Sequence, residues 1–191
     1  VARGYLPDVV IGDLDSLSDA ARRVIPAAQL HRIDDQNTTD LEKCLGLIRA
    51  RLILGIGFLG GRLDHHLAAC AAIADPAAPR CLLLGAEAVV FAARGTVALD
   101  LVPGTRVSLF PMARVQGRAT GLRWSIEGLE FATGNRTGIS NAATGPVTLT
   151  FDTPGMLVIL PRSTLSIVVA ALLVQATGDV PGTECITPPP S

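Results

Sequence analysis

The sequence predicts a mixed α/β fold, in which an N-terminal three-layer α/β domain with a parallel sheet precedes a C-terminal antiparallel β-sandwich domain. The first observation is an alternation of short apolar runs with helical patterns, which is typical of parallel α/β layers. The second is a change after about residue 90, where β-rich runs are separated by Pro-Gly turns. A length of 191 residues is enough for one or two such domains with a buried core.

Apolar runs and helical periodicity place the elements of the first half in chain order. They predict a strand at 9–11, a helix at 17–25, a helix at 40–50, a strand at 52–54, a helix at 63–74 and a strand at 81–84. The second of these helices has the clearest start, because Thr39 and Glu42 fit a capping box. Asp40 is therefore expected in the first helical turn.

The second half consists of short strands between turns. Strands are predicted at 96–102, 106–110, 147–151 and 156–160, with Pro-Gly turns at 103–104 and 154–155. The expected domains are residues 1–92, residues 93–162, and a terminal element with a tail over residues 163–191. Ile167 to Val174 is expected to form a helix or a strand, and the tail from Gln175 is expected to be disordered.

Composition excludes several classes of protein. Hydrophobic residues make up 49% of the chain and charged residues 17%, so a disordered polymer is excluded. Sixteen Lys and Arg residues against 17 Asp and Glu residues give a net charge of −1 without a basic block, so no nucleic-acid partner is expected. No apolar run approaches the ~20 residues that span a bilayer, so no membrane partner is expected. Four cysteines without a C-x-x-C pair predict reduced thiols and a cytoplasmic protein.

Two carboxylates, Asp13 and Asp15, follow directly after the first predicted strand. Side chains alternate along an extended chain, so both would lie on one face if the extended conformation persists. They would then lie at the carboxyl end of a sheet, where α/β proteins place ligands. Magnesium is held by one or two carboxylates together with substrate phosphates, so the pair suits phosphate-ester chemistry. The alternative is a loop aspartate followed by an Asp or Ser helix cap.

A polar stretch from Asp34 to Asp40 leads into the capped helix. A helix N-terminus presents unpaired backbone N–H groups and the positive end of the helix dipole, and both favour phosphate. Asp40 could join the two upstream aspartates in a metal cluster, while Gln36, Thr38 and Thr39 add neutral donors. The alternative for this stretch alone is an ordinary polar loop with a good cap.

The segment from Gly55 to His66 lies between a predicted strand and a predicted helix and contains G-x-G-x-x-G. With Glu87 after the next strand, it has the outline of a dinucleotide-binding fingerprint, so a dinucleotide or nucleotide-sugar enzyme is a rival interpretation. Against this rival, the glycines lead into Arg62 and Asp64, a phosphate-pairing cation and a further carboxylate. The two adjacent histidines would point about 100° apart on a helix, which favours one exposed and one packed histidine over a metal pair.

The sole tryptophan, Trp124, follows Arg123 in the predicted β domain. Its indole could be a stacking surface for a flat cationic ligand, and the alternative is a core residue. A glycine-containing stretch further along ends at Ser140 and Asn141. Such a composition suits a loop that brings backbone and small polar groups against a ligand.

Taken in order, these motifs resemble the thiamine pyrophosphokinase family: GDLDS, DQNTTDLEK, GGRLDH, and GLRW followed by TGISN. The resemblance covers roughly residues 5–161. It implies transfer of a pyrophosphoryl group from ATP to the hydroxyethyl group of thiamine, which gives thiamine diphosphate and AMP and uses Mg²⁺. It also implies a homodimer with active sites at the subunit interface.

The resemblance further implies roles for residues of each motif. Asp13, Asp15 and Asp40 match the acidic magnesium and catalytic site, to which Arg62 adds a cation that neutralises developing charge. The residues that match the ATP-binding side are Gln36, Thr38, Thr39, Lys43, Arg62, Asp64 and His65. The residues that match the thiamine-binding side are Trp124, Ser140 and Asn141, and the indole would stack on the ring system from the partner subunit.

Both ends of the chain depart from the family pattern. Members carry a strand and a glycine-containing segment before the part that starts here near Tyr5, so the α/β domain is expected to lack its first strand. From Ser163 onward the sequence matches nothing in the family. A thiamine- or nucleotide-binding module without catalysis is therefore the non-enzyme alternative.

Overall fold

The computed structural model describes residues 5–176. Within this range the chain divides into two compact units, residues 5–48 and residues 49–176. The strands form a large, mostly antiparallel sheet and a smaller parallel one. The predicted mixed α/β class is thus confirmed, whereas the domain limits expected at residues 92 and 162 stay predictions.

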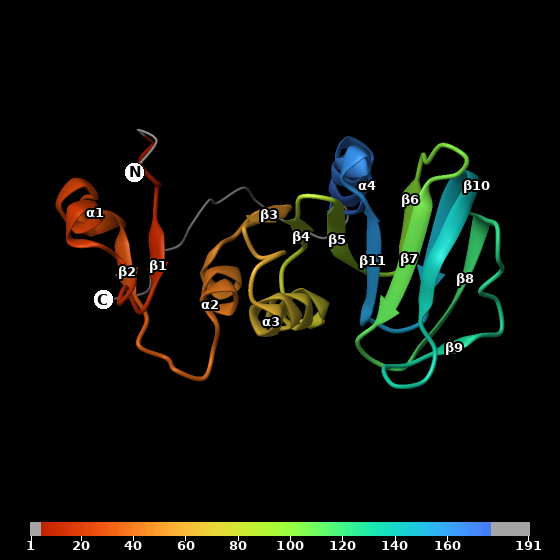
Figure 1. Cartoon of the computed structure of the whole chain (residues 1–191), viewed down its shortest axis with the longest axis horizontal. Coiled ribbons are helices and arrows are strands. Elements are labelled where there is room, and N and C mark those ends of the chain that lie inside the picture. The colour runs from red at the N-terminus through yellow and green to blue at the C-terminus, as the bar shows by residue number, and fades with distance from the viewer. Residues whose placement is uncertain (1–4, 177–191) are drawn as a thin grey trace. The chain divides into compact units, whose positions relative to one another are not determined.

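The first unit combines a two-stranded parallel sheet with two helices (Figure 1). Its elements are β1 (Val10–Gly12), α1 (Asp19–Val24), the 3-10 turn η1 (Ala27–Gln29), β2 (Leu30–Arg32) and α2 (Asp40–Leu47). Strands β1 and β2 pair in parallel, with Val10 opposite Leu30. Leu41 and Leu45 of α2 are buried, and this helix lies against β1. The packing places the N-terminus of α2 close to the carboxyl end of β1.

The second unit contains the large sheet and two longer helices. Its elements are β3 (Ile53–Ile56), α3 (Leu63–Ala74), β4 (Cys81–Leu84), β5 (Ala88–Ala93), β6 (Thr96–Leu99), β7 (Arg106–Pro111), β8 (Val115–Leu122), β9 (Glu130–Phe131), β10 (Gly138–Phe151), β11 (Met156–Pro161), the 3-10 turn η2 (Arg162–Thr164) and α4 (Leu165–Ala176). Strands β3 and β4 are parallel and flank α3 in sequence, as a βαβ unit requires.

The remaining ladders of the second unit are antiparallel. The strand order is β3-β4-β5-β11-β7-β10-β8-β9, and β6 also pairs with β10. The long strand β10 pairs with β7 over residues 138–142, with β8 from Ala143 to Phe151, and with β6 over residues 147–150. Figure 1 shows β11, β7, β10 and β8 side by side in this order. Strand β10 therefore connects the antiparallel strands on the β7 side with those on the β8 side.

A single hydrophobic cluster fills the second unit. Phe91, Leu109, Leu149 and Val158 come from four different strands and are all fully buried. Val168 and Leu172 of α4 belong to the same cluster, so the final helix is part of this core. Burying aliphatic and aromatic side chains of this size stabilises the folded chain by ~1.5–3 kcal/mol each relative to leaving them exposed.

Sequence patterns located most elements but missed several strands. The helix at 63–74 and the strand at 81–84 agree with the structure residue for residue. The patterns missed β2, β5, β8, β9 and the first half of β10. Strand β8 contains two glycines and three polar residues among its eight, so its ladder with β10, rather than its own composition, specifies it.

The C-terminal element is a helix. Its apolar pattern left helix and strand open, and the structure forms α4 through Ala176. The predicted disordered tail begins at Gln175, and its residues from 177 onward lie outside the described range. No helix within residues 5–176 is long and apolar enough to cross a membrane.

Candidate functional site

The chain does not stay extended beyond β1. Leu14 has a φ of 65°, in the left-handed region. The carboxylate of Asp13 accepts the backbone N–H of Asp15 at 3.0 Å, and the carbonyl of Leu14 accepts the N–H of Leu17 at 3.1 Å. The condition for a shared face of Asp13 and Asp15, an extended chain after β1, is therefore not met, because the Asp13 side chain turns the chain instead.

Contacts from α1 hold this turn. The guanidinium of Arg22 donates to the carbonyl of Leu14 and to the carbonyl of Leu17 at 3.2 Å, while the Leu14 side chain is buried. A left-handed conformation costs a residue with a Cβ about 1–2 kcal/mol. Burial of Leu14 and the Arg22 contacts therefore hold the turn, and with it the backbone positions of Asp13 and Asp15.

The predicted capping box at the start of α2 is confirmed. The Thr39 backbone N–H and hydroxyl each donate to the Glu42 carboxylate at 2.7 Å. In return, the Glu42 backbone N–H donates to the Thr39 hydroxyl at 3.3 Å. The box fixes the first turn, and Asp40 occupies that turn as predicted.

Asp40 lies against the carboxyl end of β1. A Cβ added to Gly12 would lie 3.2 Å from Asp40 Oδ1, so only glycine leaves that carboxylate in place without strain. Behind it, Lys43 Nζ lies 3.5 Å from Asp40 Oδ1. The Lys43 side chain is only 5% exposed, whereas that of Asp40 is 67% exposed. A buried ammonium group thus supports an accessible carboxylate next to β1.

Arg32 at the end of β2 adds a cation that sequence patterns did not indicate. Its Nε donates to Asp34 Oδ1 at 2.6 Å. The pKa of Arg32 is raised, first by this hydrogen bond and then by the charge of Asp34, with smaller contributions from Asp15 and Asp13. The two aspartates after β1 therefore act on the same exposed cation. Arg32 was missed because β2 was not predicted. A strand this short, next to a polar stretch, has no clear sequence pattern.

The polar stretch before α2 is organised by Asp35. Its carboxylate accepts the backbone N–H of Asn37 and the hydroxyl of Thr38, both at 2.8 Å. These bonds lower the pKa of Asp35, the one to Asn37 most strongly. Gln36 is exposed next to them. Of the predicted phosphate-side residues, Gln36, Thr38 and Thr39 are thus gathered in one loop before the helix.

A second charged group begins α3 in the other unit. Arg62 immediately precedes the helix, its Nε donates to Asp64 Oδ1 at 3.1 Å, and its Nη2 bonds the other carboxylate oxygen. This two-point contact, above all the hydrogen bond, lowers the pKa of Asp64 to about 2. His65 is exposed and His66 is half-buried.

Trp124 is not a core residue. Its side chain is 54% exposed, and the Arg123 guanidinium carbon lies 5.0 Å from the ring centroid. Asn141, only 7% exposed, donates to the Trp124 carbonyl at 2.8 Å and accepts the Trp124 N–H at 3.2 Å. Ser140 has a φ of 62°, and its N–H donates to the Ser108 hydroxyl at 3.0 Å. The predicted thiamine-side residues thus form one connected group.

The metal assignment stays a prediction. Within residues 5–176, no group of three or more His, Cys, Asp or Glu side chains is arranged to hold a metal ion. The donor chemistry of Asp13, Asp15 and Asp40 nevertheless fits magnesium, which prefers oxygen ligands and is commonly bound by one or two protein carboxylates. These carboxylates can therefore supply individual ligands without forming a complete cage.

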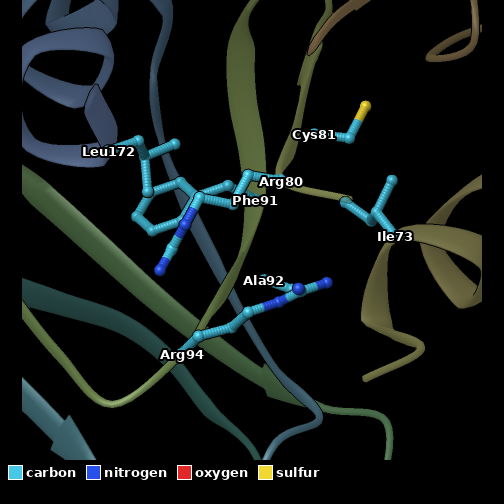
Figure 2. A pocket seen from close by; sticks show the side chains of 7 residues that line it. All are labelled: Ile73, Arg80, Cys81, Phe91, Ala92, Arg94 and Leu172. Atoms are coloured by element: carbon cyan, nitrogen blue, oxygen red, sulfur yellow. The ribbon is translucent and has the colours of Figure 1, made fainter. Parts of the chain in front are cut away.

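A small hollow lies elsewhere in the second unit. Figure 2 shows its lining side chains: Ile73, Arg80, Cys81, Phe91, Ala92, Arg94 and Leu172. Arg80 donates to Gln175 at 3.0 Å, and Arg94 donates to the Ala78 carbonyl at 2.6 Å. These contacts connect α4 and the end of α3 to the sheet. No predicted site residue lines this hollow.

The three described cysteines are free, as the cysteine pattern predicted. Cys44 is half-buried, and Cys70 and Cys81 are buried. Burial raises the pKa of the Cys81 thiol to about 11 and also raises the pKa of Cys70. These thiols therefore remain protonated at neutral pH, as expected of packing residues.

The fold places the chain in a defined class of mixed α/β proteins. The crystal structure of thiamine pyrophosphokinase from Bacillus subtilis is similar at a TM-score of 0.65 and 20% identity, over 84% of this chain and 80% of that one. The thiamin pyrophosphokinase from Candida albicans is similar at a TM-score of 0.67 and 13% identity, over 82% and 75% of the two chains. At this identity, the likeness establishes the fold alone.

The sequence comparisons establish the family. Residues 1–83 match the model of the thiamin pyrophosphokinase catalytic domain. Thiamine pyrophosphokinase 2 of Arabidopsis thaliana is 30% identical over 156 residues, which are 72% of this chain and 58% of that protein. The chain belongs to the thiamin pyrophosphokinase family. It spans about three fifths of the length of the curated relatives it matches, and these matches do not favour the dinucleotide interpretation.

Proposed function

We propose that this chain transfers a pyrophosphoryl group from ATP to the hydroxyl of thiamine, with thiamine diphosphate and AMP as products. The observation that carries the proposal is the position of Asp40, in the first turn of a capped helix and against Gly12 at the carboxyl end of β1. A carboxylate at this place is accessible to a ligand bound at the helix N-terminus. The relatives are thiamine pyrophosphokinases, which supports thiamine as the acceptor.

Two parts of the chain are proposed to donate hydrogen bonds to the phosphates of ATP: the start of α2 with its preceding loop, and Arg62. The N-terminus of α2 offers backbone N–H groups, and its preceding loop offers Gln36 and Thr38. Arg62 at the start of α3 offers a planar guanidinium that pairs with phosphate oxygens, in place of its present contact with Asp64. The remaining residues proposed for the ATP-binding side are Thr39, Lys43, Asp64 and His65. Lys43 acts from its buried position through Asp40.

The reaction forms one bond and breaks one. The hydroxyl oxygen of thiamine attacks the β-phosphorus of ATP in line, and the bond from that phosphorus to the oxygen of the α-phosphate breaks as AMP leaves. The hydroxyl proton passes to a carboxylate, for which Asp15 and Asp40 are the two candidates. Arg62 offsets negative charge as it develops on the phosphates, so positioning and electrostatics carry most of the rate.

Magnesium is the proposed cofactor. Asp13, Asp15 and Asp40 are the residues that would hold it, because their carboxylate oxygens are the ligands this cation prefers. When bound, it would neutralise phosphate charge and orient the transferring group.

Thiamine is proposed to bind on the exposed indole of Trp124. Both of its rings are flat and its thiazolium ring is cationic, so an aromatic face attracts it through stacking and through a cation–π interaction. The face is accessible, because the side chain is 54% exposed. Ser140 completes this side of the proposed site, and Asn141 belongs to it through its hydrogen bonds to the Trp124 backbone.

The remaining proposals concern assembly and location. We propose a homodimer in which the indole of one subunit serves the ATP-binding residues of its partner, and a β-sandwich as the thiamine-binding domain. Location in the cytoplasm is proposed from the three free thiols.

The direct test is AMP formation from ATP and Mg²⁺, with and without thiamine. We expect AMP only when thiamine is present, with an equal amount of thiamine diphosphate. AMP that forms equally well without thiamine would contradict the proposal. Binding of ATP and thiamine without AMP would instead support a binding module without catalysis, and thermal stabilisation by NAD alone would support the dinucleotide alternative.

A further inference from the structure

We infer that Asn141 is a positioning residue, whose buried amide fixes the backbone of Trp124 and thereby aims the exposed indole. This inference deepens the proposed function and rests on it only for the identity of the ligand. The geometry of the amide is independent of any ligand, because it is formed entirely within the second unit.

The backbone uses three of the four hydrogen-bonding positions of the Asn141 amide. Its Nδ2 donates to the carbonyl of Trp124 at 2.8 Å, and its Oδ1 accepts the N–H of Trp124 at 3.2 Å and the N–H of Ala142 at 2.8 Å. A buried amide that already has these partners has little capacity left for a ligand. At 7% exposure, the side chain is also shielded from solvent.

This contact takes over where a ladder ends. Strand β8 stops at Leu122, which is paired with Ala143 of β10, and the N–H of Arg123 still donates to the carbonyl of Ala142 at 2.8 Å. At Trp124 no backbone partner remains, and the Asn141 side chain supplies both the acceptor and the donor that a neighbouring strand would offer. The amide therefore extends the sheet by one residue pair beyond its backbone ladder.

The irregular backbone of β10 allows the Asn141 side chain to take the place of a backbone partner. The register between β10 and β7 shifts between Gly138 and Asn141, and Ser140 between them has a φ of 62°. On the β7 side, the buried hydroxyl of Ser108 accepts the N–H of Ser140. The bulge thus turns the Asn141 amide toward β8, and side chains on both sides satisfy the groups it displaces.

The consequence concerns how an exposed aromatic side chain can bind a ligand tightly. Trp124 is 54% exposed, so core packing does not hold its indole. Two backbone bonds from Asn141, together with the Arg123 guanidinium near the ring, restrict it before a ligand arrives. Restricting the indole beforehand reduces the entropy lost on binding, and this is what the hydrogen bonds from Asn141 contribute.

The first test uses the unaltered chain. The backbone N–H of Trp124 should exchange with deuterium slowly, although its side chain is exposed, because Asn141 Oδ1 accepts it. Exchange at the rate of an unbonded surface amide would overturn the inference. This measurement needs neither a ligand nor activity.

The second test uses the fact that the chain contains one tryptophan, so its fluorescence reports on this residue alone. In Asn141→Ala without ligand, we expect a shifted emission maximum and faster quenching by acrylamide. Thiamine, titrated as a quencher, should bind about 10-fold more weakly, whereas the KM for ATP should not change. Asn135→Ala is the matched control, since Asn135 is exposed on the neighbouring turn, and it should behave as the unaltered chain does.

A third variant separates positioning from direct contact. Asn141→Asp keeps the acceptor but places a carboxylate oxygen against the Trp124 carbonyl, so at pH 8 it should weaken thiamine binding as Asn141→Ala does. Thiamine binding as tight as or tighter than that of the unaltered chain would overturn the inference, because a residue touching the cationic ligand would gain from the charge. An unchanged ligand-free emission in Asn141→Ala, combined with weaker binding, would overturn it as well. Failure of the unaltered chain to bind thiamine would reject the proposed function. The hydrogen-exchange result would still show whether Asn141 holds the backbone of Trp124.

Discussion

Two regions of the molecule position their polar groups in different ways. Around Asp13 and Asp40, nearly every contact joins residues close in sequence: an aspartate turn, a capping box and an ion pair three residues apart. Around Trp124, the decisive contacts come from Asn141, 17 residues further along the chain. In the first region, local contacts hold charged groups that stay accessible. In the second, the Asn141 amide holds the backbone of Trp124, whose side chain is not packed in the core. Substitutions should therefore change chemistry in the first region and geometry in the second.

The largest effect is expected from Gly121→Ala, which tests how the second region depends on close backbone packing. A Cβ there would lie 2.0 Å from the Pro146 carbonyl oxygen, and the φ of 76° is unfavourable for alanine. We expect a loss of at least about 3 kcal/mol in the free energy of unfolding. The control is Gly128→Ala, with a φ of 74° and no atom within 4 Å of the added carbon, which should cost only about 1–2 kcal/mol. Urea unfolding measures both, and equal losses would contradict the packing argument.

Asp40→Asn should have the next largest effect, on turnover rather than on folding. It removes the proposed catalytic and metal-binding charge, and we expect AMP formation to fall at least about 100-fold. The amide oxygen of asparagine can still accept a hydrogen bond from the buried Lys43 ammonium, so the change in melting temperature should be small beside the loss of turnover. Asp19→Asn is a matched control, because Asp19 occupies the first turn of α1 as Asp40 does that of α2. Similar losses in both variants would show that helix charge, rather than this site, matters.

Gly12→Ala should impair the first region without removing any functional group. The added carbon would lie 3.2 Å from Asp40 Oδ1 at a φ of 153°, so the carboxylate must move. We expect kcat to fall about 10-fold through misplacement alone. Gly145→Ala adds the same carbon where no atom lies within 4 Å and should leave kcat unchanged. An unaffected kcat in Gly12→Ala would separate Asp40 from the chemistry at the end of β1.

The smallest expected effect is that of Thr39→Ala on stability, where it removes the side-chain cap of one helix. Loss of the capping box is expected to cost about 1 kcal/mol, which for a chain of this size lowers the melting temperature by roughly 2–4 °C. Thr39→Ser keeps the hydroxyl and should retain most of the stability. Calorimetry can compare the two variants, and an equal loss in both would argue against the cap as the cause.

Local patterns in the sequence predicted much of the first region. The capping box, the helix that follows it and the place of Asp40 in its first turn depend on residues within four positions of one another. The placement of Asp13 and Asp15 could not be predicted from strand alternation, because the hydrogen bond from the Asp15 N–H to the Asp13 carboxylate replaces strand geometry. Lys43 was identified as a functional candidate, but its burial behind Asp40 became evident only in the structure.

The second region was less accessible to prediction. A lone tryptophan leaves core and surface open, and burial alone decided in favour of the surface. Asn141 was expected to face a ligand, whereas the structure directs its amide to the backbone of Trp124. No spacing in the sequence signals that contact, because it depends on the bulge in β10 and on the point at which β8 ends.

By itself, the sequence determined the class of fold, the motifs that place the chain in its family, and the elements whose signals are local. It did so because helix periodicity and caps arise between residues a few positions apart. Only the tertiary structure decided which strands pair, where Gly12 must remain glycine, and which side chain holds Trp124. These features depend on groups that become neighbours only after the chain has folded, since each is specified by packing and hydrogen bonding across long sequence separations.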